Sequence, residues 1–394
     1  ANEITTWHQN RQTNHHSILP HPKFFLFIKD KINFSQLARY SGRNEESYRN
    51  LFAKPFDFFN FNKILIEQHI EGKKAIAFDP SYINKTGKHT AGVNYFWSGV
   101  AGQMKWGLEL GGLAILDIDH HTAFHLKAIQ TIDVKHDENL LTFYKRKLLE
   151  HKEALLTLSK YLVVDAYFSK DSFITPMRAE KFEIVSRLRN DANLNYLYTG
   201  EQKGRGRPKV YDGKVDYKNL SLHHTTCVQD NGKERIYHMQ AYSVALKITL
   251  NIVIVKTLTK HNKWQHRIYF STDLTQDWQD ILDFYKTRFQ IEFLYRDAKQ
   301  HTGLNGCEAR SKEKIDFHWN MSLTAINLAK VKYWLPKKNA MPNTDIVFSM
   351  SDVKTRYNNE LMVNKFISMF AINPKLAINR RKISEFLEFG RMAA

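Results

Sequence analysis

The spacing of apolar and polar positions predicts a mixed α/β sheet in the first half of the chain. Short apolar runs typical of buried strands cover Lys74 to Ile83, Gly107 to Asp117 and Ala123 to Val134. Apolar residues at helical spacing then run from Asn139 to Ser159. The next segment, Tyr161 to Asp165, is again an apolar strand that ends in an aspartate.

Two more elements complete this series. A helix is predicted near Lys170 to Lys181, followed by a strand at Phe182 to Arg187. The order β-β-β-α-β-α-β fits a mixed α/β sheet with helices against it.

The pattern changes between Asn195 and Asp273. Aromatic and β-branched residues alternate there with polar ones, and strands are predicted at Glu234 to Ala245, Lys247 to Leu258 and Lys263 to Ser271. This region is interpreted as an inserted antiparallel β domain.

One long helix is predicted after the insertion, from Gln276 to Gln300, and it returns the chain to the core. Shorter amphipathic helices and polar turns follow Pro336.

The N-terminal region contains a helix-turn-helix-like pattern. Two short helices are predicted at Phe34 to Tyr40 and Glu45 to Phe52, and Gly42 between them can supply a tight turn. Arg43 and Arg49 give the second helix basic residues for a DNA groove. The same pattern also fits an ordinary helical hairpin.

Composition narrows the class of partner. The 394 residues are 43% hydrophobic, enough for a full core, and carry 58 Lys and Arg against 40 Asp and Glu, for a net charge of +18. Such a balance favours a polyanion. The most apolar strip, Ala245 to Leu258, is interrupted by lysines, so no membrane partner is expected.

The two cysteines and the first residues of the chain indicate the cellular compartment. Cys227 and Cys307 lie far apart and lack metal-type spacing, which indicates a reducing, cytoplasmic environment. Ala1 to Gln12 is polar, and no targeting segment is expected. The histidines, although they number 18, lack zinc-finger spacing.

Three carboxylates are candidates for one site. Asp79 and Asp165 each follow an apolar strand, and Glu292 lies on the long predicted helix. Carboxylate oxygens suit Mg²⁺ or Mn²⁺, and two such ions can activate a water or a 3′-hydroxyl in phosphodiester chemistry. Taken singly, an aspartate at a strand end is also a common cap or turn residue.

The long helix carries a stripe of polar residues. Tyr285, Arg288, Glu292 and Lys299 recur at offsets of three, seven and fourteen, which places them within roughly 60° of arc along about 21 Å of helix. The stripe could hold a nucleic-acid backbone beside a metal-binding acid. The alternative is a solvated helix face.

The spacing Tyr285-x2-Arg288-x3-Glu292-x6-Lys299 resembles the Tyr-Arg-Glu-Lys signature of bacterial DDE transposases of the insertion-sequence-four type. The segments FDPSYINKTGKHT, YLVVDAYFSK and YFSTDLTQDWQDILDFYKTRFQIEFLYRDAKQ resemble the same family, so the similarity covers most of the chain. It implies a ribonuclease-H-like catalytic core, a β-rich insertion and cut-and-paste movement of DNA with two divalent ions.

The resemblance also implies roles for the matched residues. Asp79, Asp165 and Glu292 would be the catalytic metal ligands. The other three residues of the signature, Tyr285, Arg288 and Lys299, would hold phosphates of the transposon end.

In relatives that form a DNA hairpin, an aromatic residue of the insertion receives a flipped base. Trp264, at the start of the last insertion strand, is the candidate here, with Trp278 as a weaker substitute. A cross-strand packing role for Trp264 is equally compatible with the sequence.

A basic loop offers a further DNA contact. Arg205 and Arg207 lie in the stretch Gly-Arg-Gly-Arg-Pro, and the small residues would let both guanidiniums enter a narrow minor groove. A solvated basic loop is the alternative.

The sequence therefore predicts a DNA transposase that binds terminal repeats and target DNA, works at the bacterial nucleoid and forms a homodimer on DNA. Its rivals are a DNA-binding protein or repressor that does not cut, and a nuclease that does not join strands. The expected parts are a helical DNA-binding domain (1–72), a catalytic core in two segments (73–194 and 275–335), a β-rich insertion (195–274) and a C-terminal helical region (336–394).

Overall fold

The fold is built on one long mixed sheet. The computed structural model describes residues 22–29, 31–341, 344 and 346–392, so the polar stretch Ala1 to Gln12 lies outside the described residues. Within these residues, twelve strands form one sheet in the order β2-β3-β1-β5-β6-β12-β11-β10-β7-β8, with β4 paired to β3 and β9 to β10. The strands are β1 (Lys74–Asn84), β2 (Asn94–Ser98), β3 (Gln103–Asp117), β4 (Thr122–Gln130), β5 (Tyr161–Val163), β6 (Glu183–Leu188), β7 (Leu194–Leu197), β8 (Tyr211–Lys214), β9 (Thr226–Asp230), β10 (Glu234–Ser243), β11 (Ile248–Leu258) and β12 (Trp264–Ser271).

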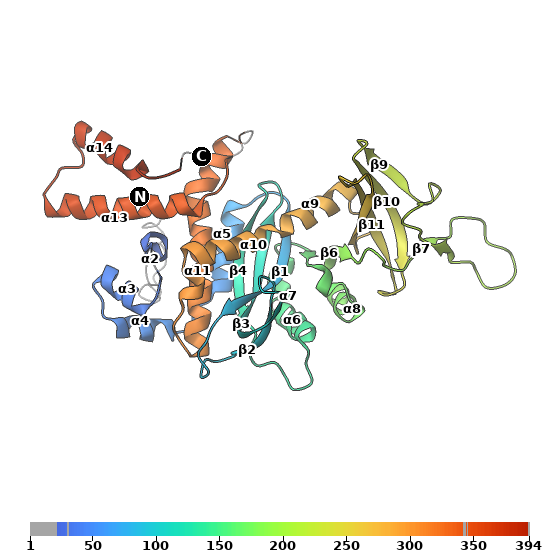
Figure 1. Cartoon of the computed structure of the whole chain (residues 1–394), viewed down its shortest axis with the longest axis horizontal. Helices are drawn as coiled ribbons and strands as arrows, with labels where there is room; N and C mark the ends of the chain where they lie inside the picture. The colour runs from blue at the N-terminus through green and yellow to red at the C-terminus, as the bar shows by residue number, and fades with distance from the viewer. Residues whose placement is uncertain (1–21, 30, 342–343, 345, 393–394) are drawn as a thin grey trace.

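The helices lie mainly at the ends and on the two faces of this sheet (Figure 1). They are α2 (Lys23–Phe27), α3 (Phe34–Ser41), α4 (Glu45–Phe52), α5 (Phe58–His69), α6 (Leu140–Leu149), α7 (Lys152–Leu156), α8 (Asp171–Ala179), α9 (Trp278–Arg288), α10 (Gln290–His301), α11 (Lys312–Ala329), α12 (Leu335–Ala340), α13 (Met350–Met369) and α14 (Ala377–Glu388), with short turns η1 (Ala166–Phe168), η2 (Leu304–Gly306) and η3 (Lys330–Trp334).

The first half of the sheet, β1 to β6, combines both strand directions. β1 pairs antiparallel with β3 over its whole length and parallel with β5, and β5 pairs parallel with β6. β4 and the inner part of β3 are buried on both faces, as expected for strands covered by helices on each side. The predicted mixed ribonuclease-H-like α/β core is confirmed.

The second half of the sheet, β7 to β12, is antiparallel throughout and forms the expected β insertion. It continues the core sheet, because β12 pairs antiparallel with β6. The insertion strands are seen beyond α9, at the opposite end of the molecule from α13 and α14 (Figure 1).

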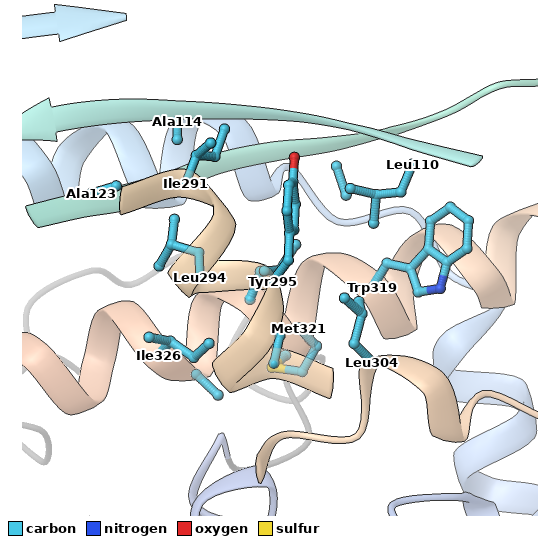
Figure 2. Close-up of a cluster of buried hydrophobic side chains, with 14 of the residues drawn as sticks. Leu110, Ala114, Ala123, Ile291, Leu294, Tyr295, Leu304, Trp319, Met321 and Ile326 are labelled. Atoms are coloured by element: carbon cyan, nitrogen blue, oxygen red, sulfur yellow. The ribbon is translucent and has the colours of Figure 1, made fainter. Parts of the chain in front are cut away.

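Helix α11 forms the centre of one hydrophobic core. Nearly every residue of α11 is buried, which is typical of a helix enclosed on all sides. Figure 2 shows this cluster, in which Trp319, Met321 and Ile326 of α11 pack beneath Leu294 and Tyr295 of α10. The core on the other face of the sheet includes residues of α6 and α8.

The N-terminal helices share the core of α11. Gly42 ends α3 in the left-handed conformation, with φ of 73°, so the predicted turn between α3 and α4 is present. Phe52 of α4 and Phe58 of α5 both pack on Phe317 of α11, at ring distances of 4.6 and 5.2 Å. Helices α4 and α5 therefore help to enclose α11.

Three sequence expectations about single elements were wrong. The helix predicted from Asn139 to Ser159 is two helices, α6 and α7. The helix predicted from Gln276 to Gln300 is also two, because Phe289 interrupts it. Strand β2 was not predicted; its alternation is short, with Phe96 and Ser98 buried and Tyr95 and Trp97 exposed.

No helix in the part of the chain that the structure describes is long and apolar enough to cross a membrane.

Candidate active site

Two parallel strands bring Asp79 and Asp165 together. Ala77 of β1 pairs with Val163 of β5, so two residues further on Asp79 and Asp165 occupy equivalent positions at the carboxyl end of β5. Neighbouring strands lie about 4.8 Å apart, which makes these two carboxylates close neighbours. The Asp165 side chain caps η1 by accepting a hydrogen bond from the Tyr167 backbone N–H at 3.0 Å.

Arg288 links the first acid to the third. Its Nη1 lies 3.4 Å from Asp79 Oδ1, and its Nη2 lies 3.2 Å from Glu292 Oε1. The arginine side chain is only 12% exposed, so this is a largely desolvated ion-pair network. Asp79, Asp165 and Glu292 thus surround one guanidinium near the sheet.

The pKa values show how strongly these groups interact. Burial raises the pKa of Asp79 to about 7; Arg288 opposes that rise, whereas Asp165 and Glu292 add to it. Burial likewise raises the pKa of Asp165, against the effect of Arg288. Two desolvated aspartates and the partly exposed Glu292 share one cation, Arg288, and a metal ion would supply further positive charge.

The donor set fits a hard divalent cation, since all three groups are carboxylates. As placed, however, no three His, Cys, Asp or Glu side chains among residues 22–29, 31–341, 344 and 346–392 are grouped closely enough to hold a metal ion. The physical reason is Arg288, which occupies the space between Asp79 and Glu292 as their counter-ion.

The other two residues of the stripe also face the sheet. Tyr285 packs edge-on against Tyr269 of β12 at 5.1 Å and lies 5.7 Å from the Arg288 guanidinium. Lys299 Nζ donates to Ser81 Oγ at 3.0 Å and to the Tyr82 carbonyl at 3.1 Å. The four polar residues of the stripe therefore do not form a solvated helix face.

Tyr295 fixes the helix that carries Glu292 to the strand that carries Asp79. Its hydroxyl, which points to the sheet in Figure 2, donates to the Asp79 carbonyl at 2.5 Å. This approach requires glycine on the next strand, because a Cβ on Gly112 would lie 1.9 Å from the Tyr295 hydroxyl oxygen. Gly112 and Tyr295 were not singled out from the sequence, since nothing in the sequence shows that they touch.

Arg187 is a third residue that sequence reasoning missed. It lies on β6 next to the strand that leads to Asp165, and its charge lowers the pKa of both Asp165 and Tyr285. A signal was available, because Arg187 ends a predicted strand in the same way that Asp165 does.

Trp264 begins β12 and is 40% exposed. Because β12 runs antiparallel to β6, the start of β12 extends past the carboxyl end of β6, the edge of the sheet where Asp165 lies. The Trp264 ring lies 4.7 Å from the guanidinium of Arg235. By strand alternation its side chain is on the face opposite Tyr269, the tyrosine that contacts Tyr285.

The arginines predicted to bind DNA lie at both ends of the molecule. Arg43 is exposed between α3 and α4, while Arg49 is paired with Glu45 and lies 5.0 Å from the Phe34 ring. Arg205 and Arg207 are exposed in the loop between β7 and β8, which extends away from the sheet (Figure 1).

Comparison with known proteins identifies the family. A family profile described as the transposase DDE domain matches residues 118–328, more than half of the chain. The chain belongs to this family. It is therefore a DDE transposase, a metal-dependent enzyme that acts on DNA. The matched segment contains Asp165 and Glu292 and begins after Asp79.

No curated protein matches the chain of this transposase. Among solved structures, the transposase is similar to the piggyBac transposase in its synaptic complex with hairpin DNA. The two share 11% identity with a TM-score of 0.44, and the match covers 95% of this chain and 76% of the other.

Proposed function

We propose that this transposase is of the insertion-sequence-four type and moves DNA by cut and paste, cleaving the terminal repeats of its transposon and joining the freed ends to target DNA. The observation that carries the proposal is the position of Asp79 and Asp165 on adjacent parallel strands, with Glu292 linked to Asp79 through Arg288. A protein that only binds DNA has no use for three carboxylates placed around one guanidinium in a positively charged protein.

Asp79, Asp165 and Glu292 would hold two Mg²⁺ or Mn²⁺ ions, which when bound activate a water or a 3′-hydroxyl and stabilise the leaving oxygen. Arg288 then has to release at least one carboxylate, and its guanidinium is well placed to take a DNA phosphate in exchange. Tyr285 and Lys299 lie beside it on the same face and would position the backbone of the transposon end.

In this proposal each predicted part of the chain has a role in the reaction. The N-terminal helices, with Arg43 and Arg49, would recognise the terminal repeat. The insertion would contribute Trp264 to a hairpin intermediate, and its basic loop would track the DNA. An enzyme with these substrates is expected to work in the cytoplasm at the bacterial nucleoid.

A homodimer on DNA is part of the proposal, because coordinated movement requires two ends to be held together. Helices α13 and α14 form a pair at one end of the molecule, joined where the Asn359 side chain donates to carbonyls of Phe386, Leu387 and Phe389. This pair exposes large apolar residues that a second copy could bury: Met362, Phe366, Met369, Phe370, Leu376, Ile378, Phe386, Phe389 and Met392.

A plasmid assay tests the function. Supercoiled plasmid carrying the transposon should be cut at the element ends with Mg²⁺ and left intact without it, and the freed 3′-hydroxyls should appear joined to a second plasmid. Glu292→Gln should bind the ends but not cut, whereas Glu153→Gln at an exposed position of α7 should behave as wild type. Binding without cutting by the wild type would indicate a repressor, and cutting without joining would indicate a nuclease.

A further inference from the structure

A polar cavity of about 310 Å³ opens between the N-terminal segment and the catalytic core. Three cations line it, Lys31, Lys85 and Arg310, together with one acid, Glu308. The remaining lining is mostly small and polar: Asn84, Thr86, Gly87, Thr90, Asn305 and Cys307. This volume would hold about ten water molecules, so it can admit a phosphate group with part of its hydration shell.

The charges in the cavity leave positive charge uncompensated. Lys31 pairs with Glu308 at 2.6 Å, and both side chains are about half exposed. Lys85 Nζ donates to the Cys307 carbonyl at 2.5 Å, and Arg310 has an exposed side chain. Burial lowers the pKa of Lys85; Cys307 and Glu308 oppose this change, whereas the charges of Lys31 and Arg310 add to it. A bound anion would relieve this repulsion.

The cavity also contains an unsatisfied polar atom. Thr90 is 5% exposed, and its Oγ1 is buried with no hydrogen-bond partner among the described residues. A buried hydroxyl without a partner costs free energy, and Thr90 is one of the residues of the cavity wall, so a bound ligand that drew this hydroxyl into the cavity would give it a partner.

Two of the three elements that carry the proposed catalytic acids, β1 and α10, lead to this cavity. On β1, Asn84 follows Asp79 by five residues, about 17 Å of strand. On the other side, α10 runs from Glu292 past Lys299 to η2, which contains Asn305. Lys299, bonded to Ser81 and Tyr82, lies between the acids and the cavity. A DNA strand that leaves the acids past Lys299 would reach the cavity after about five nucleotides, at 3.4 Å per nucleotide.

We propose that Lys85 and Arg310, with Lys31 and Thr90, form a binding site for a backbone phosphate of the DNA substrate, about five nucleotides from the cleaved bond. The inference rests on the proposed function and extends it. The phosphate would bridge the N-terminal segment, through Lys31, to the core, through Lys85 and Arg310. Binding of the transposon end would thereby stabilise the interface between the N-terminal helices proposed to recognise DNA and the core that carries the proposed catalytic acids.

The salt dependence of binding tests the contact without relying on cleavage. The probe is a 30-base-pair duplex, titrated in Ca²⁺ from 50 to 200 mM salt against wild type, Arg310→Gln, Lys85→Gln and the control Lys88→Gln. Lys88 is an exposed lysine of the same loop that does not line the cavity. For each cavity variant, loss of one phosphate contact should make the slope of log K against log salt about 0.9 less steep than that of wild type. Between 50 and 200 mM salt, the affinity of the variant for DNA should therefore drop by a factor about 3.5 times smaller than the drop seen for wild type. Lys88→Gln should keep the wild-type slope.

Position is tested with single neutral methylphosphonates along each strand of an end duplex. Wild-type binding should weaken at one position near the fifth nucleotide, and Arg310→Gln should be insensitive there while keeping its sensitivity elsewhere. Equal slopes for wild type and both cavity variants would overturn the proposal, as would unchanged sensitivity of Arg310→Gln at that position.

Inorganic phosphate separates a DNA contact from a free-anion site. If phosphate stabilises the wild type against heat but not Arg310→Gln, while the DNA slopes are equal, the cavity holds a free anion and the DNA contact is wrong. An error in the proposed phosphate site can be told apart from an error in the proposed transposase function, because Mg²⁺-dependent DNA cleavage by Arg310→Gln is measured separately. Melting temperatures check folding, and Arg310→Gln, with its exposed side chain, keeps the test valid if Lys85→Gln fails to fold.

Discussion

The two halves of the sheet differ in strand direction and in burial, although their strands belong to one continuous hydrogen-bonded sheet. In the catalytic half, β4 and the inner part of β3 are buried on both faces, and β1, β5 and β6 are parallel neighbours. In the insertion half every pairing is antiparallel, and buried positions alternate with less buried ones only from Met239 to Ser243 of β10.

This difference explains where the chemistry lies. Parallel strands present the same end at one edge, so side chains such as Asp79 and Asp165 meet there. Antiparallel strands alternate their ends and do not gather residues in this way. The insertion half is suited instead to extend a surface, and α9 connects it to the acids through the contact of Tyr285 with Tyr269.

The largest effect should come from removing one charge in the catalytic half. Asp165→Asn should lower strand cleavage by at least about 10³-fold while leaving DNA binding intact, because the substitution keeps the shape of the side chain but removes a proposed metal ligand. The same change at Asp230, on the exposed edge strand β9, should alter cleavage less than about twofold. Denaturing gels of an end-labelled duplex give both rates. Comparable losses in the two variants would contradict the division of labour between the halves.

Acid should destabilise the catalytic half first. Burial lowers the pKa of His125 on β4 to about 3 and that of His318 on α11 to about 4, whereas an unfolded histidine titrates near 6.5. The unfolded chain therefore takes up protons at these two histidines that the folded chain does not. The stability that the neutral histidines contribute is fully present above pH 6.5 and is lost as the pH falls toward 4. At pH 5 each histidine should cost about 2 kcal/mol.

Hydrogen exchange at pH 7 and pH 5 measures this effect. Amides of β4 and α11 should lose protection before those of β10 and β11, since His238 and His266 of the insertion half are partly exposed. His318→Gln keeps a donor for the Gly303 carbonyl and should remove about half of the pH dependence. Uniform loss of protection across both halves would indicate that the halves unfold as one unit.

A smaller effect is expected from Trp264 in the insertion half. If a flipped base stacks on this residue, Trp264→Ala should lower hairpin formation about 10 to 100-fold, the consequence of losing about 1 to 3 kcal/mol, and should leave nicking unchanged. Trp264→Phe should restore most of the hairpin. Gels that resolve nick from hairpin report the two steps, and equal loss of both would assign Trp264 to packing of the fold, where it contacts Arg235.

The smallest effect should come from the basic loop. Replacing both Arg205 and Arg207 with Gln should reduce the slope of log K against log salt by about 1.8, which corresponds to two phosphate contacts, without changing cleavage of bound DNA. Fluorescence anisotropy at several salt concentrations measures the slope. A slope equal to that of wild type would show that both arginines only face solvent.

The sequence by itself predicted most of the strands and three candidate acids, because both follow from local patterns. Apolar runs that end in Asp79 and Asp165 predicted buried strands with polar ends, and the spacing from Tyr285 to Lys299 predicted one helix face. It also predicted an antiparallel insertion from alternating residues, and the structure contains one.

Only the tertiary structure decided how these parts meet. The break at Phe289, the approach of Tyr295 to Gly112 and the position of Arg187 beside Asp165 all depend on residues far apart in the sequence. The same holds for the cavity between Lys31 and Arg310, whose walls come from three separate segments. Local spacing fixes the direction of a side chain on its own element, whereas packing between elements fixes which side chains become neighbours.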